Sequence, residues 1–211
     1  KQTIYPEKMP DYISRGNLSS ADRIIPYLVN NNINVIDLRG TLTKARLFND
    51  ELYYKTDTHW NTLGAYVGYR EIVKNLYMKN SIVSPVQINL KNIKFTEYIT
   101  GGDLFTMLGI KDYKFFRDAI LHYKKNYKTI ESTDKLIITE GPAVYPRCII
   151  YRDSFGAALQ PLLSNNFSYA SYISGSKIFE VNRDYVLKTK PDVLLVEIVE
   201  RHLKFLNIKL I

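Results

Sequence analysis

Residues 146–167, PRCIIYRDSFGAALQPLLSNNF, combine a short apolar run, a turn and a helical pattern, and they decide the fold class of this chain. The apolar run CIIY shows no alternation of polar and apolar residues, which is typical of a strand buried on both faces. The turn is centred on Ser154 and Phe155, and the pattern after it predicts a helix that begins near Gly156 and meets Pro161. Such a strand–turn–helix unit indicates an α/β fold.

Three further segments have the composition of strands. Residues 191–201, PDVLLVEIVER, are almost continuously apolar and are followed by a short helical tail. Residues 33–39, INVIDLR, carry β-branched side chains between turns, and residues 51–57, ELYYKTD, fit a half-buried strand. Because non-alternating strands are separated by helices, we expect a mostly parallel sheet covered on both faces, which is a three-layer α/β sandwich.

Two helices are predicted from the spacing of apolar residues. The first, LSSADRIIPYLVNN at 18–31, has Ser19 or Ser20 as its N-cap, and Pro26 is expected to kink or shorten it. The second covers 62–78, and it has one apolar stripe. That stripe consists of Leu63, Tyr66, Val67, Ile72, Val73, Leu76 and Tyr77.

Composition limits the number of domains and the classes of function. A chain of 211 residues, 45% of them hydrophobic, can bury one sizeable core, so we expect a single domain over 1–211. The formal charge of +8 favours anionic partners, but the lysines are scattered and no zinc-finger or RNP-like pattern accompanies them, so we expect no nucleic acid partner. The single cysteine, Cys148, excludes an internal disulfide. No apolar run approaches the roughly 18 residues of a membrane span.

Ser154 is the first candidate for chemistry. It follows a predicted strand and precedes a predicted helix, where free amides can stabilise an oxyanion. A serine hydroxyl becomes a nucleophile when a nearby base takes its proton. The alternative is that Ser154 is simply a helix N-cap, since serine and aspartate are preferred caps.

Asp57 and His59 are the candidate acid/base pair. Residues i and i+2 of an extended segment point to the same face, so the Asp57 carboxylate can reach the imidazole and hold its tautomer. An ordinary surface pair is the alternative. His122 and His202 lie among basic residues without a carboxylate close in sequence, and we interpret both as structural. No further His or Cys stands at ligand spacing, so we expect no metal.

Five segments appear together in an order that is similar to one known family. They are KQTIYPEKMPDY (1–12), TDTHWNTLGAY (56–66), GGDLFTMLG (101–109), YRDSFGAALQPLLSNNFS (151–168) and KPDVLLVEIVERHL (190–203). This chain resembles the DHHW and AlgX/AlgJ-like family of SGNH-hydrolase-like proteins over essentially its whole length. In that family the Asp-x-His-Trp segment precedes the serine, an order that is circularly permuted relative to most SGNH hydrolases.

The resemblance implies a catalytic triad and a function. It assigns Ser154 as nucleophile, His59 as general base and Asp57 as the orienting carboxylate. It implies an O-acetyltransferase that modifies a polysaccharide at the cell surface, outside the cytoplasmic membrane. Its partners would be the polysaccharide acceptor and a membrane-bound protein that supplies acetyl groups. It needs no metal or dissociable cofactor, because the acetyl donor is a co-substrate.

The resemblance leaves substrate contacts and two other functions open. Arg152 stands where the usual pattern has glycine, and it is a candidate substrate contact together with the Gly101/Gly102 turn, which is also a candidate for the oxyanion hole. Trp60 lines a sugar groove or belongs to the core. Relatives carry a membrane anchor and a first strand before this region, so we expect the chain to lack the N-terminal part of the full-length protein. An acetylesterase with the same triad and a catalytically silent glycan-binding or assembly module are the alternative functions.

Overall fold

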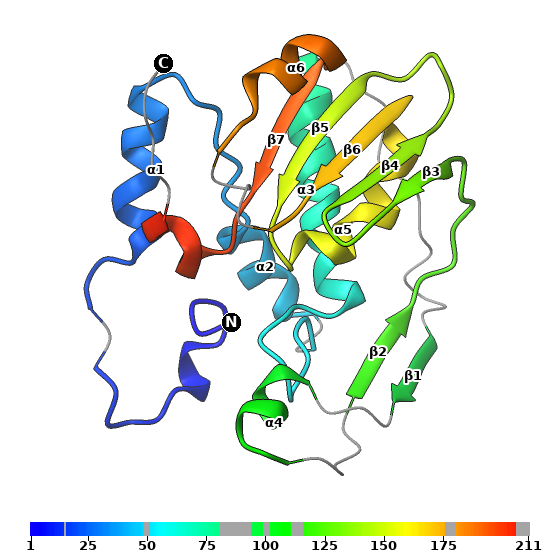
Figure 1. Cartoon of the computed structure of the whole chain (residues 1–211). Helices are drawn as coiled ribbons and strands as arrows, with labels where there is room; N and C mark the ends of the chain where they lie inside the picture. The colour runs from blue at the N-terminus through cyan, green and yellow to red at the C-terminus, as the bar shows by residue number, and fades with distance from the viewer. Residues whose placement is uncertain are drawn as a thin grey trace. The chain divides into compact units, whose positions relative to one another are not determined.

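The computed structural model describes residues 1–14, 16–48, 51–80, 94–98, 102–110, 116–175 and 180–205. The chain divides into two compact units. The first consists of Lys1–Met9 and Asp37–Lys125, and the second of Pro10–Ile36 and Asn126–Ile211. Figure 1 labels the helices and strands of both units.

A five-stranded sheet with the order β3-β4-β6-β5-β7 forms the centre of the second unit (Figure 1). Its strands are β3 (Lys128–Ser132), β4 (Leu136–Glu140), β5 (Arg147–Arg152), β6 (Tyr169–Ile173) and β7 (Val193–Glu197). β5 pairs in parallel with both β6 and β7, whereas β4 runs antiparallel to β3 and β6. The predicted α/β fold with a mixed, mostly parallel sheet is confirmed.

β5 is the point from which the chain turns to both sides of the sheet. Its residues from Cys148 to Tyr151 are each at most 2% exposed, which explains the absence of alternation in this run. The chain leaves β5 through α5 (Gly156–Leu163) to reach β6, and it later passes through α6 (Arg183–Thr189) to reach β7 on the other side of β5. In open α/β sheets, ligands bind outside the carboxyl ends of the strands at such a switch point.

Helix α1 (Ser20–Asn30) also belongs to the second unit. Ser19 caps it and forms a capping box with Asp22, because each side chain accepts a hydrogen bond from the other residue's amide. The helix continues through Pro26 to Asn30, so the expected shortening is wrong. The Ala21 amide donates to Glu200 (3.2 Å) at the start of η5 (Glu200–Phe205), which ties the helix to the last described element.

Two predicted strands are absent. Residues 33–38 are irregular and lead into α2 (Arg39–Arg46), whose first amide donates to the Asp37 carboxylate (3.0 Å). The Asp37 side chain thus starts a turn where the apolar run predicted a strand. Residues 51–57 form bends, with one antiparallel bridge between Tyr53 and Trp60.

Helix α3 (Thr62–Asn80) is the main element of the first unit. Its first turn is fixed by two side chains: the Thr62 amide donates to Asp118 (2.9 Å), and the Gly64 amide donates to Asn61 (2.9 Å). Asp118 lies on β2 (Phe116–Ile120), which pairs antiparallel with β1 (Lys94–Tyr98). The remaining short elements are η1 (Pro6–Lys8), α4 (Asp103–Met107) and η3 (Ser164–Asn166).

The predicted stripe of α3 agrees with its burial at five of its seven positions, and Val67 is half-buried. Leu63, Tyr66, Ile72, Val73 and Leu76 are buried, whereas Tyr77 is 51% exposed. Within the described ranges, none of the helices has the length and apolar character that crossing a bilayer requires.

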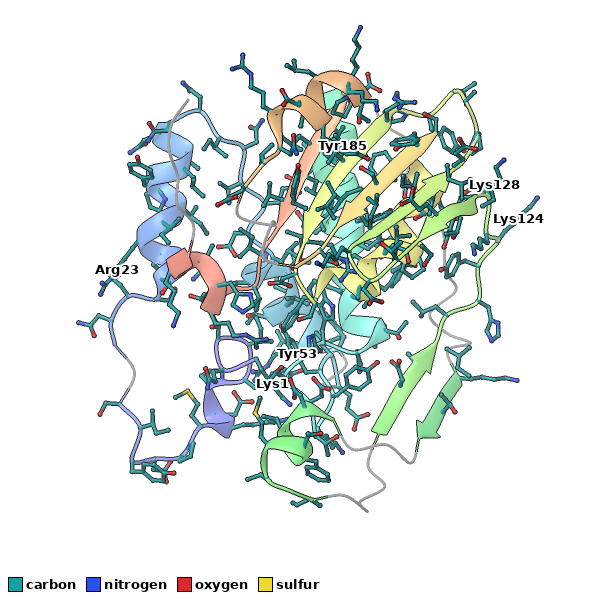
Figure 2. The ribbon with its side chains drawn as sticks, in the orientation of Figure 1. Lys1, Arg23, Tyr53, Lys124, Lys128 and Tyr185 are labelled. Carbon is teal, nitrogen blue, oxygen red and sulfur yellow. The ribbon has the colours of Figure 1, made fainter. Side chains whose placement is uncertain are left out.

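Basic side chains in the second unit point into solvent. Arg23 on α1 and Lys128 on β3 both project away from the ribbon (Figure 2). Lys128 forms an exposed ion pair with Glu140 (3.3 Å). Such pairs contribute little to stability, so these charges act mainly on solubility and long-range attraction.

Candidate active site

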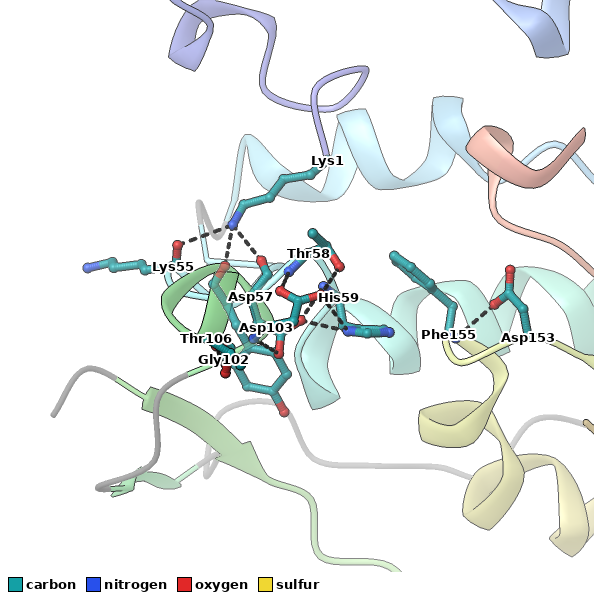
Figure 3. A network of polar contacts seen from close by, with 11 residues as sticks. Lys1, Lys55, Asp57, Thr58, His59, Gly102, Asp103, Thr106, Asp153 and Phe155 are labelled. Atoms are coloured by element: carbon teal, nitrogen blue, oxygen red, sulfur yellow. Dashed lines mark hydrogen bonds and ion pairs between the residues drawn. The ribbon is translucent and has the colours of Figure 1, made fainter. Parts of the chain in front are cut away.

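The Asp57–His59 pair lies in a tight turn just before α3. One oxygen of Asp57 accepts both the His59 amide (2.9 Å) and the His59 ring nitrogen Nδ1 (2.6 Å), as Figure 3 shows. The predicted contact between Asp57 and His59 therefore exists. It is formed in a turn that the Asp57 side chain closes, and not in the expected strand. Because Nδ1 faces the carboxylate, Nε2 is the ring nitrogen that is left to accept a proton.

A second carboxylate, Asp103, braces this turn from the start of α4. It accepts the Thr58 amide (2.7 Å) and the Thr58 hydroxyl, and its own amide donates to Asp57 (3.2 Å). One Asp103 oxygen lies 3.9 Å from the His59 ring. The sequence reasoning did not find this residue. The signal that was available is an aspartate placed directly after a glycine at a helix start.

Hydrogen bonds keep Asp57 ionised. Burial alone raises the pKa of Asp57, but donation from the His59 amide, the His59 ring and the Asp103 amide outweighs burial and lowers the pKa below its ordinary value. The Lys1 ammonium group donates to the carbonyl oxygens of Tyr54 and Asp57 (2.9 Å to Asp57) and braces the same turn (Figure 3). A charged carboxylate at Nδ1 is the state that orients a histidine base.

Asp57, His59 and Asp103 are also the one group in the described residues with three potential metal ligands, whose atoms lie within 4.8 Å of one another. Each of the three already takes part in hydrogen bonds within the turn. We therefore interpret the cluster of Asp57, His59 and Asp103 as a hydrogen-bonded group that holds the His59 ring in place.

Gly102 supports the same turn by allowing close packing. A Cβ atom at this position would lie 2.4 Å from the Thr56 carbonyl oxygen and 2.6 Å from the Asp57 Cβ atom. Gly102 therefore packs against the Asp57 backbone, and its predicted role in substrate binding stays a prediction. Gly101 lies outside the described residues.

Gly102→Ala is expected to destabilise the protein by about 1–3 kcal/mol and to lower the acyl-transfer activity that the family resemblance implies, since the added methyl group displaces Asp57. Thermal unfolding and hydrolysis of a chromogenic acetyl ester measure the two effects. Gly40→Ala is the matched control, because a Cβ atom at Gly40 in α2 meets nothing within 4 Å. It should leave activity unchanged and stability equal or up to about 1 kcal/mol higher. Equal behaviour of the two variants would contradict the packing role.

Ser154 lies in the second unit, in the turn between the carboxyl end of β5 and the start of α5. It is exposed, whereas its neighbours Asp153 and Phe155 are 6% and 4% exposed. The Asp153 carboxylate accepts the Phe155 amide (2.8 Å), shown in Figure 3, and the Val199 amide (2.8 Å). The exposed serine thus lies in a turn whose flanking residues are buried, and the Asp153 side chain holds this turn by hydrogen bonds at the switch point of the sheet.

His202 and Glu197 are additional groups at this turn. The His202 ring nitrogen Nδ1 lies 3.2 Å from Asp153, the residue that follows β5, so this histidine has a carboxylate partner that its neighbours in sequence do not provide. Glu197 accepts the Asp153 amide (3.2 Å). Glu197 and His202 lie in segment 190–203, which the sequence analysis singled out, but their contacts with Asp153 become visible only from the pairing of the strands.

Most of the chain matches a known protein family. Residues 1–143 match the model of the SGNH hydrolase-like domain of the acetyltransferase AlgX. The chain belongs to this family. The matched region contains the Asp57–His59 turn and Gly102 and ends before Ser154. No curated protein is significantly similar to the chain in sequence.

Solved structures share the fold of this chain over most of its length. Bacillus cereus PatB1 with a sulfonyl adduct has a TM-score of 0.70 at 17% identity, covering 96% of this chain and 79% of that protein. A DHHW family protein from Eubacterium siraeum has a TM-score of 0.69 at 16% identity, with 92% and 74% covered. The O-acetyltransferase domain of Pseudomonas putida AlgJ has a TM-score of 0.63 at 16% identity, with 96% and 72% covered.

The structure shows the burial and the contacts of two candidate substrate-binding residues of this AlgX-family chain, Trp60 and Arg152. Trp60 is 5% exposed and lies across from Gly68, so we assign it to the core and leave it out of the proposed substrate groove. Arg152 is half-buried at the end of β5 and donates to the Asp153 carbonyl oxygen (3.1 Å). Burial lowers the pKa of Arg152, and the Glu197 and Asp153 carboxyl groups oppose that shift.

Proposed function

We propose that this AlgX-family domain is a serine O-acetyltransferase that acts on a polysaccharide, with Ser154 as nucleophile, His59 as base and Asp57 as its orienting carboxylate. The observation that carries the proposal is the 2.6 Å contact between Asp57 and the His59 ring, in a turn supported by Asp103. The exposed position of Ser154 at a sheet switch point supports its role as nucleophile.

The reaction consists of two acyl transfers. The Ser154 hydroxyl oxygen attacks the acetyl carbonyl carbon while His59 Nε2 takes its proton, and the donor alcohol leaves with that proton. A sugar hydroxyl then loses its proton to His59 and attacks the acyl-serine, and Ser154 leaves as the free hydroxyl. Asp57 stabilises the imidazolium formed in each half. The steps need no metal or dissociable cofactor.

The proposed acceptor is a cell-surface or secreted glycan, and the proposed location is the outer face of the cytoplasmic membrane. A membrane-bound partner that supplies acetyl groups belongs to the same proposal. The support is family membership together with the net charge of +8, which attracts anionic polymers over long range without specifying them.

The test uses purified protein, a chromogenic acetyl ester as donor, and oligosaccharides from the producing cell as acceptors. We expect release of the chromophore and, in the presence of acceptor, an oligosaccharide heavier by one acetyl group. Chromophore release with no acetylated oligosaccharide would identify an acetylesterase. If neither chromophore release nor acetylation of Ser154 is observed, a glycan-binding or assembly module remains as the function.

A further inference from the structure

We propose that Glu197 is a positioning residue, whose carboxyl group at the end of β7 holds the turn that carries Ser154. This inference rests on the proposed role of Ser154 as nucleophile. It concerns a residue that neither touches substrate nor belongs to the Ser154–His59–Asp57 triad.

Glu197 contacts the turn on both sides of the serine. Its Oε2 atom accepts the amide of Asp153, one residue before Ser154 (3.2 Å), and it lies beside the backbone of Gly156, two residues after Ser154. A Cβ atom at position 156 would lie 2.8 Å from Oε2 of Glu197. Glycine at this position therefore gives the carboxyl group access to the helix start.

Asp153 completes the support from beneath. Its two oxygens accept the amides of Phe155 (2.8 Å) and Val199 (2.8 Å) and contact the His202 ring (3.2 Å). Two amides of the turn, those of residues 153 and 155, thus donate to carboxyl groups. β5, β7 and η5 are joined at a single point below Ser154.

Burial and the neighbouring Asp153 charge favour the neutral form of Glu197, which lets the two carboxyl groups lie close together. Burial, followed by the nearby charge of Asp153, raises the pKa of Glu197 well above its ordinary value, and the two side chains share a hydrogen bond. The other charged or titratable groups at this cluster are Arg152 from β5 and His202 from η5. A neutral Glu197 donates its proton to Asp153 and accepts the Asp153 amide with its other oxygen, which a glutamine side chain can imitate.

Such support matters for a nucleophile because acyl transfer requires the attacking oxygen at a well-defined position. A displacement of about 1 Å costs on the order of 100-fold in rate. Ser154 stands on a short turn, so its position depends on the groups that hold the turn's amides. Glu197 provides one of these contacts from a strand of the sheet, which is more rigid than a loop.

The test compares Glu197→Gln, Glu197→Ala and Glu197→Asp with Glu140→Ala, which removes the glutamate that ends β4 in an exposed ion pair. The acetylation rate of Ser154 by an activated ester is followed by mass spectrometry in single turnovers. We expect the Ala and Asp variants to be about 10- to 100-fold slower at saturating ester, with little change in the half-saturating concentration. Glu197→Gln and Glu140→Ala should stay within about threefold of the unmodified protein.

The pH profile separates positioning from a general structural role. Ionisation of Glu197 at high pH places two negative charges together, so the unmodified protein should lose rate at alkaline pH while Glu197→Gln keeps it. If Glu197→Ala fails to fold, the Asp variant carries the comparison. An Ala or Asp variant as fast as the unmodified protein, or a Gln variant as slow as Ala, overturns the proposal.

Hydrogen exchange keeps this inference separate from the proposed function. The amide of Asp153 should exchange at least about fivefold faster in Glu197→Ala than in the unmodified protein or Glu140→Ala. Unchanged exchange overturns the positioning role even if Ser154 is acetylated. Absence of acetylation in the unmodified protein, with faster exchange in Glu197→Ala, instead refutes the nucleophile assignment alone.

Discussion

Replacing Ser154 by alanine is expected to reduce acetyl-ester turnover by more than about 10³-fold and to abolish the acetyl-enzyme seen by mass spectrometry. In the proposed reaction, the hydroxyl oxygen is the atom to which the acetyl group is transferred, so no second group replaces it. Folding should be unaffected, because the Ser154 side chain is exposed at the end of β5.

Ser174→Ala is the matched control for this variant. Ser174 follows β6 as Ser154 follows β5, and the two strands are parallel, so both serines lie at the same edge of the sheet. Its hydroxyl donates to the Asp134 carbonyl oxygen (2.8 Å) and has no place in the proposed chemistry. A residual acetyl-enzyme in Ser154→Ala, or an equal loss in Ser174→Ala, would refute Ser154 as the nucleophile.

Asp57→Asn is expected to lower turnover by about 10²- to 10⁴-fold with the fold intact. The asparagine keeps the size of the side chain but cannot stabilise the imidazolium, and its amide group favours the wrong tautomer of His59. Turnover of the chromogenic ester measures the loss, and circular dichroism measures the fold.

Asp37→Asn tests whether the loss is specific to the turn. Asp37 is also in the first unit, where it forms a 2.7 Å ion pair with Arg39 at the start of α2, and we expect activity to remain within about twofold. Equal turnover of Asp57→Asn and the unmodified protein would make Asp57 a bystander. The carboxylate supporting His59 would then have to be Asp103, which lies 3.9 Å from the ring.

The position of Ser154 could be predicted because its determinants are local. The run before it lacks alternation because β5 is covered on both faces, and the helix after it begins at Gly156, as the spacing of apolar residues indicated. The proximity of Asp57 and His59 was predicted for the wrong reason. Residues two apart can meet on one face of a strand or across an aspartate-closed turn, and pattern alone does not separate these cases.

The supports of both turns could not be predicted because they depend on distant contacts. Asp153 and Glu197 are 44 residues apart, and they meet only because β5 and β7 are neighbours in the sheet. Asp103 approaches Thr58 from 45 residues away through the close packing that Gly102 allows. The strand predicted at 33–39 failed for the converse reason: its composition suits a strand, but the Asp37 side chain accepts the first amide of α2, which begins at Arg39.

The contact between α1 and η5 has a consequence for the order of folding during synthesis. The Ala21 amide and the Glu200 carboxylate are separated by 179 residues, although both belong to the second unit. At about 5–20 residues per second, a ribosome makes Glu200 roughly 10–35 s after Ala21. The capping box of α1 can form at once, but its docking must wait until the sheet strands have emerged. This helix therefore lacks its contact with η5 until almost the whole chain has been made.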